Sequence, residues 1–566
     1  MKILRPLLVL ALVLIIAAVA TFWLNKPARV DMSNYVPADS LVYIEVNSLD
    51  DVTKAIQETD AWRAAAEVAG LNSNPQSSLL VSAAKSGIGP IEAVISTRAQ
   101  MALVIVGIDT AEKDDSLRIK PEVAVVVETN TAHWRIKNTV NTNLKRLANF
   151  AYGSAECKER TADAEFIDCA ESKGSRKLVG AVDGSVVIIG NSDKSVQNCL
   201  AVRHGQRPSL HTDQEFMSAR ANLKGESSLA FGYVSPASSA KLVSWGAPLL
   251  LGKAPGDSQV EQLLSNSAAK ILGGIAWTST AVQGKIEDRY QISLDTEVVK
   301  RLGPAFDASR DTSDFTKYLP DAFRSLSIYN SKDPEVAWFS LNSAVALKLD
   351  AVASVLFASL LRSSLAAYGV ENPKEFLSAL APPLVTIRPA LGENSLLLAR
   401  VKNEAALKTA LTADLLRENK GQILTGYQSD PDKAKEFAAV FLDGFIVLGK
   451  SENVAVYLAQ LRSNEMLKPD HVQVLRNAPG DSSVTSFTSE RESIVGVISI
   501  LTSLRGRTLS EAQLEEIRKR INNIDVSQTE SSLNSTGIER RSQSAFGQFG
   551  SLLSFAQADS SPTTIR

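Results

Sequence analysis

Hydrophobic and polar positions follow two periods along this chain, one typical of strands and one typical of helices. The runs with strand-like alternating or continuous apolar character are Met101–Gly107, Glu122–Glu128 and Ser395–Val401. The runs with helix-like spacing of apolar residues are Asp51–Ala69, Ala132–Ala151 and Ala344–Tyr368. Strands and helices are therefore predicted to be interspersed along the whole chain.

Two Asp-Gly pairs mark the clearest turns. Asp183-Gly184 and Asp443-Gly444 each lie between two runs rich in β-branched and other apolar residues. Such a pair predicts a β-hairpin with a type I′ turn, which needs positive φ at both central positions. Hairpins pair their strands antiparallel, so the sequence predicts an α+β fold with mainly antiparallel sheets and packed helices.

The surroundings of the two hairpins are also similar. A helix is predicted after each one, at Asp193–Val202 and Glu452–Arg462, and the matched positions stay roughly 250–260 residues apart. Opening strands are predicted at Leu41–Val46 and Val336–Leu341. We interpret this as an ancient duplication that produced two similar domains. The predicted divisions are a linker at 25–34, domain one at 35–305, a linker at 306–314, domain two at 315–556 and an unstructured tail at 557–566.

The amino terminus carries the strongest local pattern. Lys2 and Arg5 precede residues 6–24, which carry no charge and would span ~28 Å as a helix, close to the ~30 Å of a bilayer core. A cleaved signal peptide is the alternative, because 18–20 read Ala-Val-Ala. We favour an uncleaved signal anchor, because the apolar run continues past that point. The anchor predicts a single-pass cell-membrane protein with residues 1–5 in the cytoplasm and the bulk of the chain in the periplasm.

Composition narrows the class of protein. Hydrophobic residues make up 45% and charged residues 22%, which excludes wholesale disorder. Lys plus Arg total 60 against 62 for Asp plus Glu, so no overall basic character indicates nucleic acid binding. Three cysteines exclude a disulfide-dense scaffold. Cys157 and Cys169 flank a short polar stretch and could pair in an oxidising compartment, whereas Cys199 is interpreted as a buried thiol.

The opening segment Val36-Pro37-Ala38-Asp39-Ser-Leu-Val-Tyr43, the anchor and the repeated Asp-Gly and helix unit resemble bacterial envelope proteins with a domain of unknown function, the 3352-type family. The resemblance covers most of the chain by layout and length. It implies a bacterial, membrane-anchored protein and supplies no functional residue.

Several short patterns match catalytic or binding motifs but have simpler structural interpretations. Residues 444–451 match the phosphate-loop pattern G-x4-G-K-S, but the four residues between the glycines are Phe, Ile, Val and Leu, which favour a buried strand. Three S-x-x-K pairs occur without a downstream K-T-G strand, at Ser82 with Lys85, Ser238 with Lys241 and Ser267 with Lys270. Glu287 with Arg289 and Glu539 with Arg541 are predicted to form surface ion pairs on the last strand of each repeat.

The sequence therefore predicts a protein without a catalytic set, cofactor, metal, nucleotide or nucleic acid partner. We expect a duplicated, non-catalytic body, held at the membrane by its N-terminal helix, that binds a protein, lipid or glycan partner in the cell envelope, with a ligand between its halves. Two alternatives stay open: an envelope hydrolase whose active site is assembled from distant segments, and a structural or assembly factor.

Overall fold

The fold is taken from a computed structural model, and the account covers the residues that it describes. These are 29–71, 99–113, 116–131, 133–250, 266–309, 315–320, 323–349, 354, 364–390, 395–411, 424–425, 437–463, 482–503, 507–522, 524 and 526–551. We call 29–309 the N-terminal portion and 315–551 the C-terminal portion.

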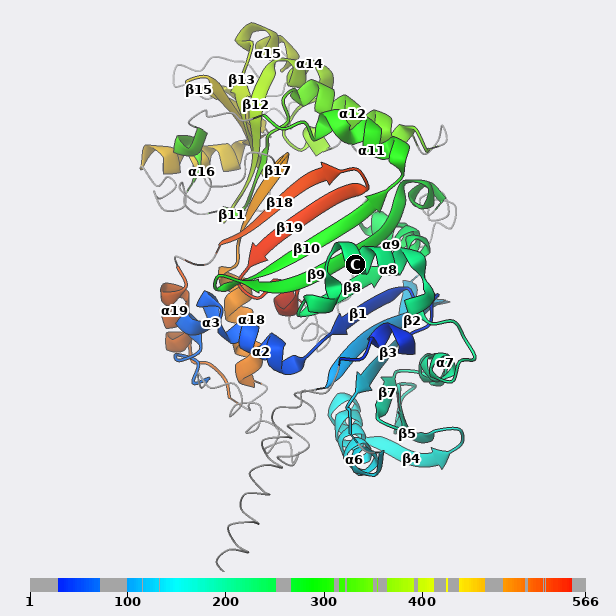
Figure 1. Ribbon diagram of the computed structural model, residues 1–566. Coiled ribbons are helices and arrows are strands. Elements are labelled where there is room, and N and C mark those ends of the chain that lie inside the picture. The colour runs from blue at the N-terminus through cyan, green and yellow to red at the C-terminus, as the bar shows by residue number, and fades with distance from the viewer. Residues whose placement is uncertain are drawn as a thin grey trace, which may run out of the picture.

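Groups of strands and helices are interspersed through the N-terminal portion (Figure 1). Its strands are β1 (Val42–Val46), β2 (Gln100–Lys113), β3 (Ser116–Glu128), β4 (Ala155–Thr161), β5 (Glu165–Glu171), β6 (Lys177–Asp183), β7 (Val186–Gly190), β8 (Ala230–Val234), β9 (Leu272–Val282) and β10 (Lys285–Leu294). Its helices are η1 (Met32–Tyr35), α2 (Leu49–Gln57), α3 (Asp60–Ala65), α6 (His133–Tyr152), α7 (Asp193–Arg203), η2 (Leu210–Thr212), α8 (Gln214–Asn222), η3 (Gly225–Ser227), α9 (Pro236–Leu250), α11 (Thr296–Leu302) and η4 (Gly303–Ala305).

The C-terminal portion is built in the same way. Its strands are β11 (Phe323–Tyr329), β12 (Leu380–Pro389), β13 (Leu396–Val401), β14 (Leu424–Thr425), β15 (Phe437–Leu442), β16 (Phe445–Lys450), β17 (Val484–Ser489), β18 (Val526–Asn534) and β19 (Gly537–Ser544). Its helices are η5 (Phe315–Tyr318), α12 (Pro334–Ala346), α14 (Pro373–Ser378), α15 (Glu404–Ala410), α16 (Ser451–Arg462), α18 (Arg491–Ser503) and α19 (Glu511–Arg520).

The same order of strand pairing occurs in both portions. In the N-terminal portion β1 pairs with β2 and β8, β2 with β3, β3 with β7, β6 with β7, β8 with β9 and β9 with β10. In the C-terminal portion β11 pairs with β12 and β17, β12 with β13, β13 with β16, β15 with β16, β17 with β18 and β18 with β19. All of these pairings are antiparallel.

The predicted fold class, an N-terminal transmembrane helix followed by two similar domains with mainly antiparallel sheets, is wrong. β10 pairs antiparallel with β19 from Ile286 opposite Ser544 to Ser293 opposite Gly537, so strands of both portions form one continuous sheet (Figure 1). The physical reason lies in the sheet edges. A long edge strand exposes unpaired backbone groups, and joining the two edges satisfies them. We call this pair of strands the seam.

The membrane prediction is also corrected. Among the described residues, no helix is both long enough and apolar enough to cross a membrane. The helix with the required length, α6, has 20 residues but carries four basic side chains, at positions 135, 137, 145 and 146. The described helices therefore give no support to the predicted signal anchor, single-pass topology and periplasmic location, which we do not propose again. The residues that we assigned to the anchor, 6–24, lie outside the described residues.

The two Asp-Gly hairpins form, but their turns differ from the prediction. In the first hairpin Asp183 already pairs with the first residue of β7, so the loop is Gly184-Ser185, with φ +61° at Gly184. In the second hairpin the loop is Asp443-Gly444, and only Gly444 has a positive φ, at +79°. Neither turn is type I′, because that turn needs positive φ at both loop residues.

Two predicted elements were assigned wrongly. The segment Val336–Leu341 was predicted as the opening strand of the second repeat, but it lies inside helix α12, where Asp333 caps the N-terminus and Pro334 occupies the first turn. The opening strand is β11 instead. The helix predicted at Asp51–Ala69 is split into α2 and α3, because Thr59 accepts a hydrogen bond from the Trp62 amide and begins a new helix.

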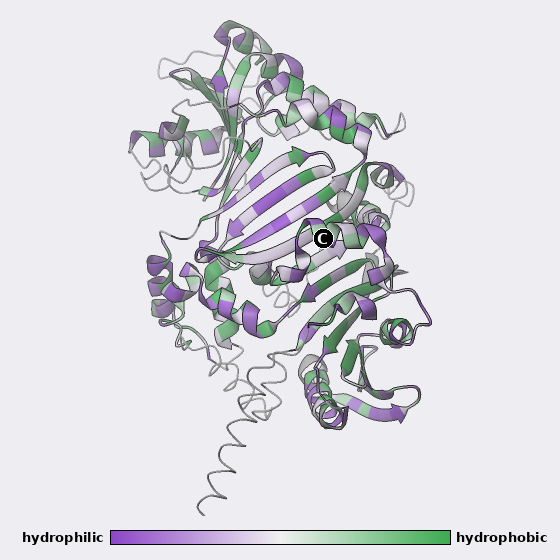
Figure 2. Cartoon of the chain, viewed as in Figure 1, coloured by the Kyte–Doolittle hydropathy of each residue, from purple (hydrophilic) through white to green (hydrophobic). Residues whose placement is uncertain are grey.

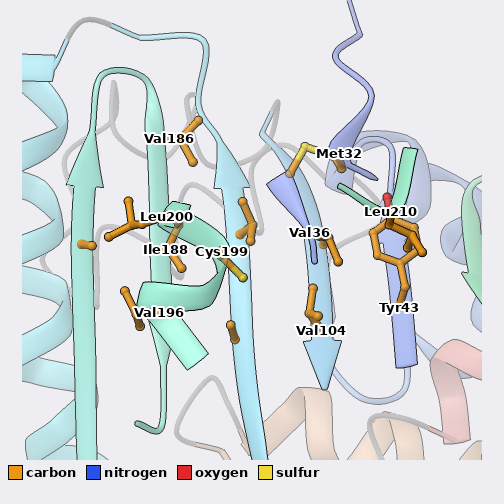
Figure 3. Close-up of a cluster of buried hydrophobic side chains, with 14 of the residues drawn as sticks. Met32, Val36, Tyr43, Val104, Val186, Ile188, Val196, Cys199, Leu200 and Leu210 are labelled. Carbon is orange, nitrogen blue, oxygen red and sulfur yellow. The ribbon is translucent and has the colours of Figure 1, made fainter. Parts of the chain in front are cut away.

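Apolar side chains from both faces of the sheet form the core. The largest cluster in the N-terminal portion joins η1, β1, β2, β7, α7 and η2, and includes Tyr43, Val104, Ile188, Cys199 and Leu210 (Figure 3). A second cluster joins the portions, because Trp62 of α3 packs in the same cluster as Ile498 of α18 and Ile517 of α19. The two portions are therefore linked by apolar contacts as well as by strand pairing.

The cysteines have two different environments. Cys157 of β4 lies opposite Cys169 of β5, and the two form a disulfide. Cys199 lies on α7 with its side chain buried, and burial raises the pKa of its thiol to about 12. Such a thiol stays protonated and unreactive near neutral pH.

Candidate functional site

A cavity of about 550 Å³ lies where the two portions meet, at the start of β9 and the end of β10. We call it the junction cavity. Helix α8 lines one side, β8, β9 and β10 line the floor, and Thr536 from the turn between β18 and β19 completes the wall. Gln291 of β10 donates a hydrogen bond to the Thr536 hydroxyl (3.1 Å), and the Leu294 amide donates to the Thr536 carbonyl (3.0 Å). The C-terminal portion thus supplies a firmly held part of this site.

Tyr233 of β8 lines the junction cavity from an aromatic cluster. Its ring meets Phe216 of α8 edge to face at 5.3 Å, and Phe216 meets Tyr43 and Phe231 in the same way. The side chain of Tyr233 is only 4% exposed, and its hydroxyl has no hydrogen-bond partner among the described residues. Burial raises the pKa of this hydroxyl, and Asp213 and Glu215 raise it further, so it remains a neutral group that can donate.

Gly273 and Gly274 form a β-bulge in the floor of the cavity. Ile275 pairs with Ile292 and Leu272 pairs with Leu294, so the two glycines together oppose the single residue Ser293. A Cβ on Gly273 would stand 2.9 Å from the Ser293 Cβ, and one on Gly274 would stand 3.2 Å from Cε2 of Tyr233. Glycine is therefore needed for this close approach, and it leaves bare backbone in the cavity wall.

The other polar groups of the cavity are mostly uncharged. Helix α8 contributes Gln214, Ser218 and Asn222, which are four residues apart and so lie on one face. Strand β10 contributes Gln291 and Ser293. The charged residues of the lining are Glu215, Lys270 and Asp295. Glu215 and Lys270 are exposed and opposite in sign, whereas Asp295 caps α11 and pairs with Lys348 at 3.2 Å. The cavity consequently has no strong preference for one sign of charge.

A buried ion network fixes α8 against the sheet behind the cavity. Arg220 of α8 pairs with Asp31 at 2.6 Å and with Glu45 of β1 at 2.8 Å, and Tyr43 donates a hydrogen bond to Glu45 at 2.7 Å. Burial raises the pKa of Glu45, and the Arg220 charge opposes that shift. The charges of Arg220, Asp31 and Glu45 are paired, although Glu45 Oε1 and Arg220 Nε have no hydrogen-bond partner among the described residues. We assign this network the structural role of positioning α8 and its cavity-lining side chains.

A second cavity of about 360 Å³ lies at the seam and brings titratable groups together. Asp288 of β10, Tyr290 of β10, Glu490 and Arg540 of β19 all line it. The two carboxylates already accept hydrogen bonds from backbone amides. Glu490 accepts from Ala545 at 2.7 Å, and Asp288 accepts from Gln548 at 2.9 Å. They therefore cap the C-terminal helical turn.

The repeated Glu-x-Arg pairs do meet at the seam, but not as two separate surface pairs. Glu287 is 2% exposed and accepts hydrogen bonds or ion pairs from Arg289 at 2.8 Å, Arg541 at 2.5 Å and Gln543 at 3.0 Å. Glu539 lies opposite Gln291. The sequence showed the recurrence of the pattern, but only the pairing of β10 with β19 places Arg541 beside Glu287.

The other sequence motifs fall in ordinary elements. Residues 445–450 of the phosphate-loop pattern form strand β16, and the side chains of Phe445, Ile446, Val447 and Leu448 are buried. Lys270 of one S-x-x-K pair lines the junction cavity, whereas Ser82 and Lys85 lie outside the described residues. Among the described residues, no group of three or more His, Cys, Asp or Glu side chains is arranged to hold a metal ion.

Sequence reasoning missed the residues that shape the junction cavity. Tyr233, Ser218 and Thr536 carry no motif and come from elements far apart in the chain. One signal was readable: the pair Gly273-Gly274 near the start of a β-rich run indicates a bulge. The four Asp and Gly residues of the two hairpins do not line any of the cavities described here.

Comparison of the chain with protein-family models, with curated proteins and with solved structures found no match in any of the three. The resemblance to envelope proteins of the 3352-type family therefore stays a prediction, and the function has to be argued from the site itself.

Proposed function

We propose that this protein is a non-catalytic binding protein that takes a small, neutral, hydroxyl-rich ligand of the saccharide class in the junction cavity. One observation carries the proposal: a cavity of about 550 Å³ that both portions line, with Tyr233 in its wall, whose buried hydroxyl has no hydrogen-bond partner among the described residues. The volume lies within the roughly 300–1,000 Å³ that small-molecule sites occupy.

The chemistry of the lining supports this ligand class. Amide and hydroxyl side chains such as Gln214, Asn222 and Ser293 each offer a donor and an acceptor, which matches a ligand with several hydroxyl groups. The bare backbone at Gly273 and Gly274 allows a sugar ring to approach closely. A ligand with a net charge would find no buried countercharge there.

The experiment is calorimetric titration of the full-length protein with glucose, N-acetylglucosamine and maltose, and with glucuronate and glucosamine as charged counterparts. We expect saturable binding of at least one neutral sugar and weaker binding of its charged analogue. In Ser218→Trp, an exposed position on α8, the indole would occupy the cavity and reduce the affinity at least about tenfold.

Ser378→Trp is the matched control, because Ser378 is an exposed helix residue of α14 that does not line the cavity. Its affinity should equal that of the unmodified protein. The proposal would be wrong if none of the five sugars bound, or if Ser218→Trp bound them as tightly as Ser378→Trp.

A hydrolase is one of the two alternatives left open, and the seam cavity is the described cavity that brings two carboxylates together. Asp288 and Glu490 are the carboxylates of that cavity, and each accepts a backbone amide of the C-terminal segment. No specific observation in the described part of the chain favours catalysis over binding.

A further inference from the structure

Three polar side chains at the seam end of the junction cavity form a closed ring of hydrogen bonds. Asn534 donates through Nδ2 to Gln291 Oε1 at 3.1 Å, and Gln291 donates through Nε2 to the Thr536 hydroxyl at 3.1 Å. Thr536 completes the ring by donating through Oγ1 to Asn534 Oδ1 at 2.9 Å. We call this ring the seam triad. Gln291 and Thr536 line the cavity, whereas Asn534 does not.

The turn between β18 and β19 holds the seam triad in place. Asn534 Oδ1 also accepts from the backbone amides of Thr536 at 2.9 Å and Gly537 at 3.0 Å, and Gln291 ties the ring to β10. Hydrogen bonds in such a network strengthen one another. A hydroxyl has one hydrogen to donate, and that of Thr536 is already used within the protein.

The α8 side of the cavity is different. Gln214, Ser218 and Asn222 line it and make no side-chain hydrogen bond to another described residue. They can therefore donate to a ligand and accept from it. Beside the seam triad, the lining includes Leu272 and Leu294, which lie opposite each other on β9 and β10. The cavity thus has a hydrogen-bonding wall on α8 and a wall at the seam whose polar groups already bond one another.

We propose that the junction cavity selects a 6-deoxyhexose, with the ring hydroxyls toward α8 and the C6 methyl group at the seam wall. Asn534 is the residue that determines this specificity, because it engages the Thr536 hydroxyl and Gln291 from behind the wall. The proposal rests on the proposed function, since it concerns the same cavity. A hydroxymethyl group at this wall would give up hydrogen bonds with water without replacing them, whereas a methyl group has none to lose.

The experiment is calorimetric titration of the full-length protein with two pairs of sugars that differ by one oxygen atom. The pairs are 6-deoxy-D-glucose with D-glucose, and D-fucose with D-galactose. The 6-deoxy member of at least one pair should bind at least about fivefold more tightly, the lower end of the effect of an unpaired buried hydroxyl. The ratio of the two affinities is the readout, because a variant that only loosens the fold weakens binding of both sugars alike.

Variants of the turn test the role of the seam triad. Asn534→Ala releases the Thr536 hydroxyl, so the ratio should fall toward one. Asn534→Asp keeps an oxygen that accepts from Thr536 and should keep the preference. Thr536→Val retains the methyl group without the hydroxyl and should also keep it, which tests the wall even if Asn534→Ala does not fold. Ser535→Ala is the matched control, because Ser535 is exposed in the same turn and does not line the cavity.

The outcomes separate this proposal from the proposed function. Equal affinity of the unmodified protein for the two members of each pair would overturn the 6-deoxy preference and leave sugar binding intact. A ratio in Asn534→Ala as high as that in Ser535→Ala would overturn the role of the seam triad. If no sugar bound, the proposed function would fail and this proposal with it.

Discussion

At the scale of single residues, two neighbouring carboxylates on β10 show how hydrogen-bond partners determine the pKa of a buried acid. Glu287 and Asp288 are each 2% exposed and point to opposite faces of the strand. Burial raises the pKa of Glu287, but hydrogen bonds from Arg541, Gln543 and Arg289 outweigh it and the pKa falls below its usual value. Asp288 accepts from Trp277, Ser279 and the Gln548 amide, which are all neutral, so burial raises its pKa.

The two carboxylates should therefore affect stability with opposite dependence on pH. Glu287 stabilises the fold above the ordinary Glu pKa of about 4.3, and its contribution is lost as pH falls through its lowered value. The contribution of Asp288 is largest below the ordinary Asp pKa of about 3.9 and is lost as pH rises through its raised value. In urea unfolding from pH 7 to 3.5, the deficit of Glu287→Gln should shrink in acid and that of Asp288→Asn should grow. The same trend in both variants would contradict this account.

Two buried tyrosines allow the effect on stability of the Tyr233 hydroxyl in the junction cavity to be compared with that of a hydrogen-bonded hydroxyl. Tyr457 of α16 is 1% exposed and donates to the Tyr318 carbonyl at 2.7 Å, whereas the Tyr233 hydroxyl has no partner among the described residues. Tyr457→Phe should lower the free energy of unfolding by about 1 kcal/mol, because it removes a satisfied hydrogen bond. Tyr233→Phe should be neutral or stabilising by up to about 1 kcal/mol, because it removes an unsatisfied group.

Chemical unfolding of the ligand-free protein measures both values. A loss in Tyr233→Phe as large as that in Tyr457→Phe would show that the Tyr233 hydroxyl is satisfied without ligand. That result would remove one reason for regarding the cavity as a binding site, since natural proteins leave such groups unsatisfied mainly at functional sites.

At the scale of elements, the seam is the distinctive feature. β10 and β19 would each be an edge strand if the portions were separate, and their pairing removes both edges. Polar residues follow β10, β18 and β19 across the middle of the molecule, as Figure 2 shows. Because that region is polar, register at the seam depends on specific contacts such as Glu287 with Arg541 rather than on apolar packing alone.

Gly537 at the start of β19 is the most sensitive position of the seam. Its φ is +149°, and a Cβ there would overlap the Ile292 carbonyl of β10 and stand 3.0 Å from the Leu294 amide nitrogen. Gly537→Ala should lower the free energy of unfolding by about 1–3 kcal/mol, because backbone of two strands must separate. Gly496→Ala in α18 is the control, since nothing lies within 4 Å of its Cβ position and alanine favours a helix.

Thermal or urea unfolding of the two variants gives the comparison. Gly496→Ala should be neutral or slightly stabilising. If Gly537→Ala were as stable as Gly496→Ala, the close approach of β19 to β10 would be wrong.

The sequence predicted individual helices and strands better than the contacts between them. Helix α7 begins at Asp193, as predicted from the pattern after the first hairpin, and Ser192 is its N-cap. Both capping and periodicity are local properties of the sequence. The strand predicted at Val336–Leu341 became helix α12 because an N-terminal cap at Asp333 outweighed the β-branched character of the segment. The type I′ turn is found at Gln283-Gly284, which connects β9 and β10 and has φ +45° and +78°, rather than at either Asp-Gly pair.

At the scale of the whole molecule, the sequence could not show how the parts meet. The partners in the junction cavity, such as Ser218 and Thr536, come from distant parts of the chain and carry no spacing signal. The repeated order of strand pairing is visible only in the completed sheet, as is the fact that its two copies share one edge. A site built at that shared edge depends on both portions, so disruption of the seam should weaken ligand binding as well as stability.

The central claim is that the junction cavity is a ligand site, and a crystal structure of the protein soaked with the tightest-binding neutral sugar tests it most directly. We predict density for the sugar in the junction cavity, in contact with α8 side chains and with the Gly273-Gly274 backbone, within hydrogen-bond distance of the Tyr233 hydroxyl. Density for the sugar at any other place, with only water in the junction cavity, would contradict the claim.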